Sequence, residues 1–334
     1  MRLAIISTIF HYPWGGPDKR WTALAEACQA RGDAVFLGLA PLTVDHPRVR
    51  ALVEKGATLW LRPNRSAYVG KVDQWARRVP FVRQRYLETQ LDRFRPDVVF
   101  LLQGGAYDCF QEYHLLRWCR ANGVPYILNC SLNRRGANFG PQTIDAFVRD
   151  FREAGKVLFM STENLRITEE LFREQLGNAV VIQNPLDLEI SPDEIGPALP
   201  GSRPKLGFVG RIDIHHKGLD LLLEAIARVR PEFDVELHLT GRSEKPEEFT
   251  ALVERHGLTD RVFVHDHVGR EGLIKAYAEA ELMVLPSRWE GCASVMLEAM
   301  MSGRPQLVTP VGGVSDWLTD GVDAFVAENV SVDA

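Results

Sequence analysis

Short runs of Val, Ile, Leu and Ala alternate with longer amphipathic stretches along nearly the whole chain. This alternation is typical of βαβ units, in which buried strands form a parallel sheet and helices cover its faces. We therefore expect an α/β fold whose strands lie at 3–7, 34–39, 57–61, 97–102, 125–129, 156–160, 180–183, 205–209, 235–240, 262–265, 282–285 and 306–309.

The segment 187–204 interrupts this pattern. It holds prolines at 192, 197, 200 and 204 and glycines at 196 and 201, and it has neither helical nor strand periodicity, which indicates a linker. The chain of 334 residues is also long enough for about two domains. We expect two Rossmann-like domains, 1–186 and 205–334, with sheets facing a central cleft and ligands bound beyond the carboxyl ends of the strands.

Composition narrows the class of protein. Hydrophobic residues make up 46% and charged residues 25%, as in average globular proteins, and the net charge of −5 gives no nucleic-acid footprint. The five cysteines form no CxxC pair, which favours reduced thiols and a cytoplasmic location. An apolar run follows Arg2, but His11 and Pro13 stand where a signal peptide would have its cleavage site, so a buried first strand is expected.

The most informative motif is the segment 286–300, which follows a predicted buried strand and runs into a helix ending near Gly303. A strand, a turn with Gly291 and a helix start of small residues, Cys292 and Ala293, supply free N–H groups and a positive dipole end, as a phosphate requires. Within it, Glu290 and Glu298 are eight residues apart, about 12 Å if both are helical. One carboxylate could then reach a sugar and the other a ribose.

These two glutamates also have a purely structural interpretation. Glu290 would then be an acidic residue favoured by the helix dipole, and Glu298 a solvated residue on the outer face of the helix. Cys292 has no neighbouring base or cysteine partner and is interpreted as a packing residue.

A second motif runs from Gly210 to Gly218, again directly after a predicted strand. Its Arg211 and Lys217 are placed where two cations could clamp a diphosphate, the arginine through its planar fork and the lysine as a mobile charge. A weaker third element is Gly15-Gly16 after the first strand, where glycine would let the backbone approach a ligand, unless the pair only forms a tight turn.

Together these residues resemble the retaining glycosyltransferases of family 4 (glycosyl transferases group 1), which have the GT-B fold. The resemblance is strongest over 205–325. It covers the Gly-Arg and Lys-Gly pairs, Glu290 and Glu298, and the segments 297–300, 302–305, 311–313 and 320–321. In the first half it is limited to Gly15-Gly16 and to 183–187, which is similar to the Asn-Gly-Val-Asp segment of that family.

The resemblance implies a retaining, metal-independent transferase that moves a sugar from a nucleotide-sugar donor to a glycan or lipid-linked acceptor in cell-surface polysaccharide or glycolipid synthesis. No metal ion or other cofactor is expected. By carry-over, Arg211 and Lys217 would bind the diphosphate and act in catalysis, Glu298 would bind the ribose, and Glu290 would bind the transferred sugar as a third catalytic residue. The other predicted donor-binding residues are Gly15, Gly16, Gly210, Gly291, Cys292 and Ala293. Domain 1–186 would bind the acceptor, with Asn129, Arg134 and Arg135 as predicted contacts.

Two departures keep other functions open. The first domain has Asn129-Cys130-Ser131 where family members carry a histidine, and the sequence ends at Ala334, where the family continues through closing helices. We interpret the chain as a truncated piece or one that closes differently. The alternatives are a non-catalytic nucleotide-sugar-binding module and a nucleotide-sugar epimerase; no motif indicates the pyridoxal phosphate that a phosphorylase would need.

Two weaker signals complete the sequence. Segment 62–95 holds nine Lys or Arg and three acidic residues, with aromatic residues between them. One hypothesis is a peripheral contact with the inner face of an anionic membrane, and the other is a pair of solvated helices. Histidines at 215, 216, 265 and 267 lack a third ligand at zinc spacing, and we expect surface or donor-lining histidines there.

Overall fold

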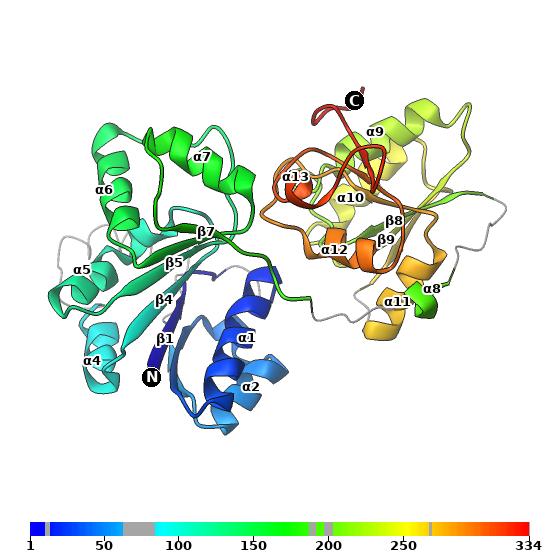
Figure 1. The fold of residues 1–334 in the computed structure, drawn as a ribbon. Coiled ribbons are helices and arrows are strands. Elements are labelled where there is room, and N and C mark those ends of the chain that lie inside the picture. Colours follow the sequence, from blue (N-terminus) through cyan, green and yellow to red (C-terminus); the bar gives the residue numbers. More distant parts are fainter. Residues whose placement is uncertain (11–13, 63–83, 187–191, 197–202, 267–268, 334) are drawn as a thin grey trace. The chain divides into compact units, whose positions relative to one another are not determined.

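The computed structural model describes the chain except for residues 11–13, 63–83, 187–191, 197–202, 267–268 and 334 (Figure 1). The chain divides into two compact units, Met1–Pro185 and Leu186–Ala334. Each unit is built around its own parallel sheet, so the predicted fold class of two α/β domains is confirmed. Much of the predicted linker 187–204 lies outside the described residues, but the short helix α8 (Pro192–Ile195) falls within it.

The first unit has a sheet of seven strands in the order β3-β2-β1-β4-β5-β6-β7. Its strands are apolar on both sides because helices cover both faces, which is why the sequence shows near-continuous hydrophobic runs. The strands are β1 (Arg2–Ser7), β2 (Ala34–Leu39), β3 (Thr58–Leu61), β4 (Val98–Gln103), β5 (Tyr126–Cys130), β6 (Lys156–Phe159) and β7 (Ala179–Val181).

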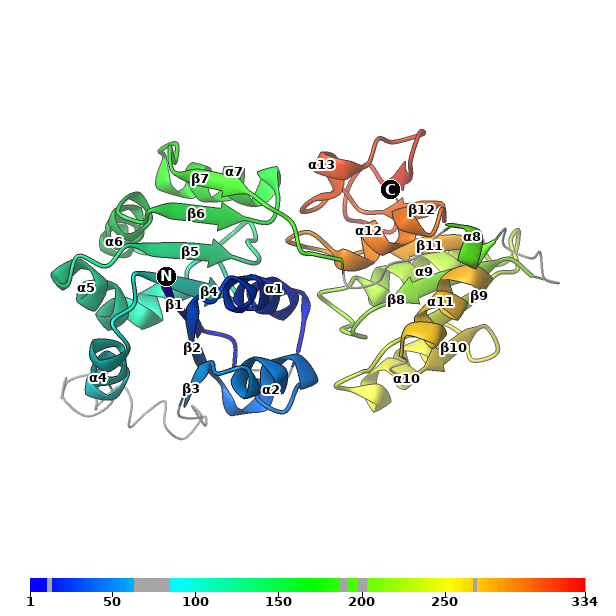
Figure 2. The ribbon, with the colours of Figure 1, turned by 60° about the horizontal axis from the view of Figure 1, so that its bottom comes forward.

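Helices of the first unit pack on both sides of this sheet (Figures 1 and 2). On one face, Trp21 of α1 and Leu52 of α2 pack against Ile5 and Leu37 of the sheet. On the other face lie α4, α5, α6 and the end of α7, with Phe147 among the fully buried side chains. The helices are α1 (Gly16–Ala30), α2 (Pro47–Glu54), α4 (Gln84–Phe94), α5 (Tyr113–Ala121), α6 (Pro141–Arg152) and α7 (Thr162–Phe172), with short 3-10 helices at Pro41–Thr43 and Asp108–Glu112.

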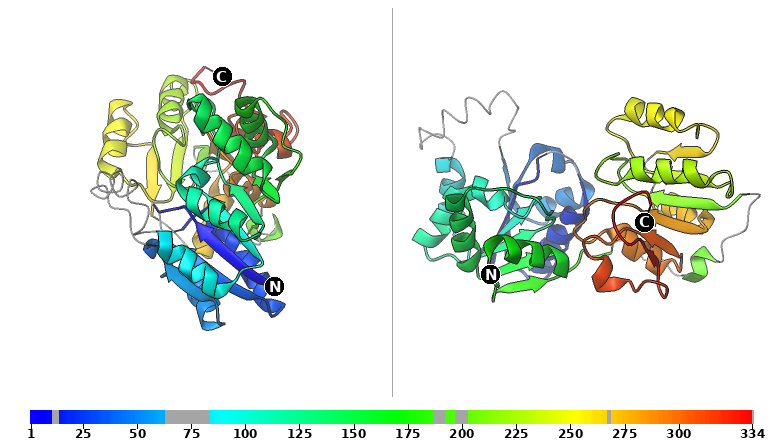
Figure 3. Two further views of the ribbon diagram at one scale, coloured as in Figure 1. Left: turned by 90° about the vertical axis from the view of Figure 1, so that its left-hand side faces the viewer. Right: turned by 90° about the horizontal axis from the view of Figure 1, so that it is seen from above.

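The second unit has a sheet of six strands in the order β10-β9-β8-β11-β12-β13. Phe208 and Val284 face α9 and α10, whereas Val209 and Met283 face α11 and α12; Figure 3 shows these layers from two further sides. The strands are β8 (Lys205–Val209), β9 (Glu236–Thr240), β10 (Val262–His265), β11 (Leu282–Leu285), β12 (Gln306–Val308) and β13 (Phe325–Val326). Besides α8, the helices are α9 (Leu219–Val229), α10 (Pro246–Arg255), α11 (Arg270–Glu279), α12 (Ser294–Met301) and α13 (Val314–Trp317).

Strand order reverses once in each sheet, between β1 and β4 in the first unit and between β8 and β11 in the second. At such a reversal the loops after the two neighbouring strands leave in opposite directions, so a crevice opens between them at the carboxyl ends. The loop after β1 carries Gly15-Gly16, and the loops after β8 and β11 carry the two motifs with Arg211 and Glu290. The topology therefore puts the predicted donor residues of the second unit at one edge of its sheet.

All five cysteines are buried thiols. Within the described ranges, no helix combines the length and the apolar character that crossing a bilayer requires.

Candidate functional site

The candidate donor site is formed by two loops of the second unit that are far apart in sequence. Strand β8 pairs with β11 in parallel, with Leu206 opposite Leu282, so the loops that follow these strands start side by side. The first loop carries Arg211 and Lys217, and the second carries Glu290. Cations and a carboxylate from two separate motifs are thus brought to one edge of the sheet.

Lys217 and Glu290 are in direct contact. The Lys217 Nζ donates a hydrogen bond of 2.5 Å to Oε1 of Glu290, and the side chains are only 14% and 10% exposed. Ser287 Oγ donates to the same oxygen at 2.7 Å. Burial would raise the pKa of Glu290, but Lys217, His216 and the Ser287 hydroxyl together hold it below its ordinary value. Glu290 is therefore an ionised carboxylate at neutral pH, held in a fixed orientation.

Arg211 lies at the same edge and is more exposed, at 38%. Its guanidinium lies 3.7 Å from the carboxylate of Asp213 and 3.5 Å from that of Glu244. Its Nη2 also lies 3.4 Å from Nδ1 of His216. A partly exposed guanidinium whose acidic partners are themselves partly exposed can turn its fork toward an anionic ligand.

Glu298 is on α12 and is 4% exposed, so the alternative that it is a solvated residue is wrong. Its Oε2 accepts a hydrogen bond of 2.8 Å from the hydroxyl of Tyr277 on α11. The estimated separation of about 12 Å assumed that both glutamates lie on one helix, and this assumption is wrong. Helix α12 begins only at Ser294, and Glu290 lies in the loop before it. The predicted order of strand, glycine-containing turn and helix is confirmed.

The two donor loops are tied together by contacts that the sequence analysis missed. Arg288 donates to both carboxylate oxygens of Asp220 at 2.6 and 2.8 Å and also to the carbonyl of His215. Burial would raise the pKa of Asp220, but the Arg288 guanidinium keeps it below its ordinary value. Arg288 and Asp220 are 68 positions apart, so no local sequence pattern indicates their contact. The contact follows from the pairing of β8 with β11.

Two glycines are required where these loops meet. Gly218 has a φ of +62°, and a Cβ there would lie 1.9 Å from the carbonyl oxygen of Pro286. Gly312 has a φ of +61°, and a Cβ there would lie 2.6 Å from the carbonyl oxygens of both Glu290 and Gly291. Since no side chain fits at such distances, these glycines let the backbone approach the site closely.

The remaining predicted donor residues of the second unit also lie in these loops. Gly210 follows β8 and donates its N–H to the carbonyl of Thr240 at 3.0 Å. Gly291, Cys292 and Ala293 are buried in the turn before α12, in agreement with a packing role for Cys292.

In the first unit, Gly15 and Gly16 begin α1. The Gly15 N–H donates to the carboxylate of Asp18 at 2.9 Å, and the Asp18 N–H donates back to the Gly15 carbonyl at 3.0 Å. Asp18 also accepts a hydrogen bond from the Trp21 indole, and burial raises its pKa to about 6. The glycine pair thus has a helix-capping role, and its role in donor binding stays a prediction.

The predicted acceptor residues end or follow β5. Asn129 is fully buried, donates to Ser131 at 3.3 Å, and its Oδ1 has no hydrogen-bond partner in the described part of the chain. Arg135 is half-exposed and paired with Glu170 of α7 at 2.8 Å. The Arg134 N–H donates to Asn133, whose amide reaches Thr168 at 2.7 Å and fixes this loop on α7. Their contact with an acceptor stays a prediction.

The basic segment 62–95 was expected to be exposed, but Arg62 is buried. This side chain is 4% exposed, pairs with the carboxylate of Glu112, donates to the Ser7 carbonyl and lies 4.9 Å from the ring centre of Phe10. The inclusion of Arg62 in an exposed basic face is therefore wrong, because its guanidinium is buried in the first unit and paired with Glu112. Residues 63–83 of this segment lie outside the described residues.

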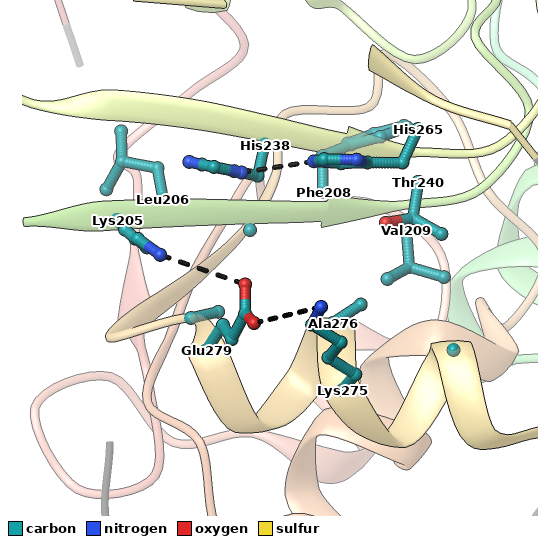
Figure 4. A pocket seen from close by; sticks show the side chains of 13 residues that line it. Lys205, Leu206, Phe208, Val209, His238, Thr240, His265, Lys275, Ala276 and Glu279 are labelled. Atoms are coloured by element: carbon teal, nitrogen blue, oxygen red, sulfur yellow. Dashed lines mark hydrogen bonds and ion pairs between the residues drawn. The ribbon is translucent and has the colours of Figure 1, made fainter. Parts of the chain in front are cut away.

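A cavity of about 210 Å³ lies between α11 and strands β8, β9 and β10 (Figure 4). Its walls carry His238, His265 and Thr240 on the sheet and Glu279 on the helix, and none of the predicted donor residues is among the described residues that line it. The His238 and His265 rings stack and approach within 3.1 Å through Nδ1 and Nε2. His265 is therefore paired with a histidine that the sequence analysis did not single out, while His267 lies outside the described residues.

Comparisons with known proteins show which proteins the chain resembles. Residues 203–334 match the family model described as glycosyl transferases group 1. Over 133 residues the chain is 35% identical to the glycogen synthase of Halorhodospira halophila. The match covers 37% of this chain and 25% of that protein. Over 133 residues it is 32% identical to the D-inositol 3-phosphate glycosyltransferase of Xylanimonas cellulosilytica, and the match covers 39% of this chain and 31% of that protein. The chain thus spans about a quarter to a third of the length of these curated relatives.

Likeness to solved structures extends over both units. The structure of Anabaena HepE in complex with UDP-glucose has a TM-score of 0.72 and 17% sequence identity, and the match covers 99% of this chain and 86% of that one. At this identity the likeness establishes the fold. Residues 203–334 of this chain are thus similar to the glycosyl transferases group 1 family, and the chain has the GT-B fold of the solved glycosyltransferases that it resembles.

Proposed function

We propose that this chain is a retaining, metal-independent glycosyltransferase that uses a nucleotide-sugar donor, bound by domain 205–334. Domain 1–186 would bind a glycan or lipid-linked acceptor of cell-surface polysaccharide or glycolipid synthesis. The observation that carries the proposal is the contact between Lys217 and Glu290, beside Arg211, at the strand-order reversal of the second sheet. The match of residues 203–334 to the group 1 family supports it, and the likeness to the complex of Anabaena HepE with UDP-glucose supports the class of donor.

The proposed roles follow from charge and burial. Lys217 uses one of its three N–H donors on Glu290, which leaves two for a phosphate oxygen. Arg211 supplies a second cation through its exposed fork. In the transfer, the bond between the sugar C1 and the diphosphate oxygen breaks, and a bond from the acceptor hydroxyl oxygen to C1 forms on the same face. The acceptor proton passes to the departing diphosphate. Cations fixed beside that diphosphate stabilise the charge it gains, which lowers the barrier.

The two glutamates would bind the sugar and the ribose of the donor. Glu290 is ionised and oriented by Lys217 and Ser287, so its second oxygen can accept hydrogen bonds from hydroxyls of the transferred sugar. Glu298 is held through one oxygen by Tyr277, and its other oxygen would accept the ribose hydroxyls. In the first unit, Arg134 and Arg135 are the proposed acceptor contacts.

The test begins with UDP-glucose, GDP-mannose and ADP-glucose in a thermal-shift assay of the full chain. A donor that binds only the folded state raises its melting temperature. Lys217→Ala and Arg211→Ala should each weaken binding of the matching nucleoside diphosphate by about tenfold or more, because each removes a charge-assisted contact. The matched controls are Lys245→Ala and Arg228→Ala, which change exposed cations of the same unit. Unchanged affinity in both Lys217 and Arg211 variants contradicts the assignment.

Product analysis separates the remaining alternatives. Transfer or slow hydrolysis of the donor with release of nucleoside diphosphate indicates a transferase. Conversion to another nucleotide sugar indicates an epimerase, and tight binding without turnover indicates a binding module. The anomeric configuration of the product, measured by NMR, tests retention directly.

A further inference from the structure

His216 belongs to the first donor loop and contacts the second. Its Nε2 is 3.0 Å from the carbonyl oxygen of Trp289, and its Nδ1 is 3.4 Å from Nη2 of Arg211. The imidazole also stacks on the Trp289 indole, with ring centres 5.1 Å apart and planes 11° apart. The backbone N–H of His216 donates to the carboxylate of Asp213 at 3.0 Å, which fixes the backbone of this residue.

These contacts determine where the imidazole proton lies. A carbonyl oxygen can only accept a hydrogen bond, so Nε2 of His216 must carry a hydrogen. A guanidinium can only donate, so Nδ1 must present its lone pair to Arg211. Both ring nitrogens are therefore satisfied by one species, the neutral imidazole with its hydrogen on Nε2.

We propose that His216 is a positioning residue for donor binding: the neutral imidazole holds the Arg211 guanidinium at the donor edge, and protonation releases it, so that donor binding weakens in acid. This inference rests on the proposed function, because it assigns Arg211 to the donor diphosphate. It adds a titratable residue of the first motif to the groups that control donor binding.

The groups around His216 explain the effect of protonation. Arg211, Asp213 and Lys217 face it from its own loop, and Glu290 faces it from the loop after β11. Burial lowers the pKa of His216, and Lys217 acts in the same direction, against the opposite influence of Glu290 and Asp213. A proton on Nδ1 would put an N–H donor and a positive charge against Arg211. The guanidinium would then be left to the carboxylates of Asp213 and Glu244.

The first test reads the imidazole of the ligand-free full chain by nitrogen NMR, with His216→Asn used to assign the signal. Near neutral pH the Nε2–H form is expected. Arg211→Met should raise the pKa of His216, because it removes both a like charge and a donor aimed at Nδ1. An Nδ1–H form, or a pKa that Arg211→Met leaves unchanged, overturns the proposal.

The second test measures the affinity of UDP-glucose, GDP-mannose and ADP-glucose between pH 5 and 8. Their diphosphates are esterified at both ends and do not titrate in this range. For the wild-type chain we expect the affinity to fall about three- to tenfold on acidification, the range that loss of one hydrogen bond gives. Because Arg211 is also proposed to stabilise the departing diphosphate, kcat should fall over the same pH range.

Two substitutions separate the contacts of the two ring nitrogens. Asparagine places an oxygen near the position of Nδ1, so His216→Asn should keep the neutral-pH affinity and lose its pH dependence. Glutamine places its amide near Nε2, so His216→Gln should be weakened about threefold to tenfold throughout, because Arg211 loses its acceptor. His256→Asn, at the end of α10, is the control and should keep the wild-type pH dependence.

The failures of the two hypotheses can be told apart. If a donor binds but its affinity depends on pH in the same way in His216→Asn, the role of His216 is wrong while the proposed function stands. If none of the three donors binds, the proposed function fails and the role of His216 in donor binding fails with it. The imidazole spectrum still reports whether His216 and Arg211 are paired.

Discussion

The hydroxyl of Tyr277 donates a hydrogen bond of 2.8 Å to Oε2 of Glu298, and both side chains are buried between α11 and α12. Burial and the adjacent carboxylate raise the pKa of Tyr277 well above its ordinary value, so the phenol stays a donor throughout the physiological range. One carboxylate oxygen is thus committed to the protein. The orientation of the other oxygen is fixed as a consequence.

Tyr277→Phe keeps the ring and removes only this donor. We expect binding of UDP to weaken about three- to tenfold, because Glu298 loses its orientation toward the ribose, and the free energy of unfolding to fall by about 1–3 kcal/mol. Calorimetric titration with UDP and with inorganic pyrophosphate makes the comparison. Pyrophosphate has no ribose, so its affinity should not change; equal losses for both ligands would contradict the assignment. Tyr113→Phe, at an exposed position of the first unit, is the control.

Lys217→Met leaves the carboxylate of Glu290 buried without its ammonium partner. Breaking a buried ion pair by removing one partner costs about 3–5 kcal/mol, and we expect urea denaturation at pH 7 to show a loss of this order. The double variant Lys217→Met with Glu290→Gln should recover much of this stability, since no charge is then left unpaired. It should not recover donor binding. Recovery of both would mean that the pair is only structural.

The same pair predicts a pH dependence. The folded-state pKa of Glu290 lies below its ordinary value of 4.5, so its contribution to stability is present above pH 4.5 and is lost as the pH falls through the folded-state value. In Lys217→Met the pKa of the buried carboxylate should rise instead, and its contribution should then be lost with increasing pH. Urea denaturation of both chains between pH 4 and 8 tests this: the difference in their stability should shrink toward low pH.

Gly312→Ala tests the close approach of its loop to the donor site. Besides the strain of a positive φ, the new methyl group would stand 2.6 Å from the carbonyl oxygens of Glu290 and Gly291 and would push the turn before α12. We expect donor affinity to fall at least tenfold. Gly303→Ala is the matched control, because its φ is +65° but nothing lies within 4 Å of its Cβ. That variant should lose about 1 kcal/mol of stability and keep its donor affinity.

Asp18 should make the first unit more stable in mild acid. Its folded-state pKa of about 6 lies above the ordinary 3.8, so its contribution is fully present below pH 3.8 and is lost as the pH rises through 6. The difference corresponds to about 3 kcal/mol. Asp18→Asn does not titrate, so its stability curve between pH 4 and 8 should lack this component. If the stability of the wild-type chain and of Asp18→Asn changes with pH in the same way, folding does not raise the pKa of Asp18.

The strands were predictable because a parallel sheet buries both of its faces. Continuous apolar runs such as Leu282–Leu285 mark such strands directly, and most predicted strand ends agree with the structure within one or two residues. Loops after strands were also the right place to look for polar residues, because the carboxyl ends of parallel strands share one edge.

The contacts that orient the site could not be predicted in this way. Lys217 and Glu290 were each given a separate role. Their contact depends on β8 lying beside β11, because the two residues are 73 positions apart in the sequence. The sequence analysis did not single out Tyr277, because the position of an aromatic residue in a helix does not reveal the partner of its hydroxyl. Arg62 looked like part of a basic surface, since its buried partner Glu112 is 50 residues away.

The strand-order reversal between β8 and β11 also determines how much the spacing of the donor motifs can vary. Glu290 and Glu298 are joined by one turn and the start of α12, so inserting even one residue between them would rotate Glu298 away from Tyr277 by about 100°. Between Lys217 and Glu290 the chain passes through three helices and three strands, whose surface loops absorb insertions at little cost. Related sequences should therefore vary in length between Lys217 and Glu290 while keeping the seven positions between the two glutamates.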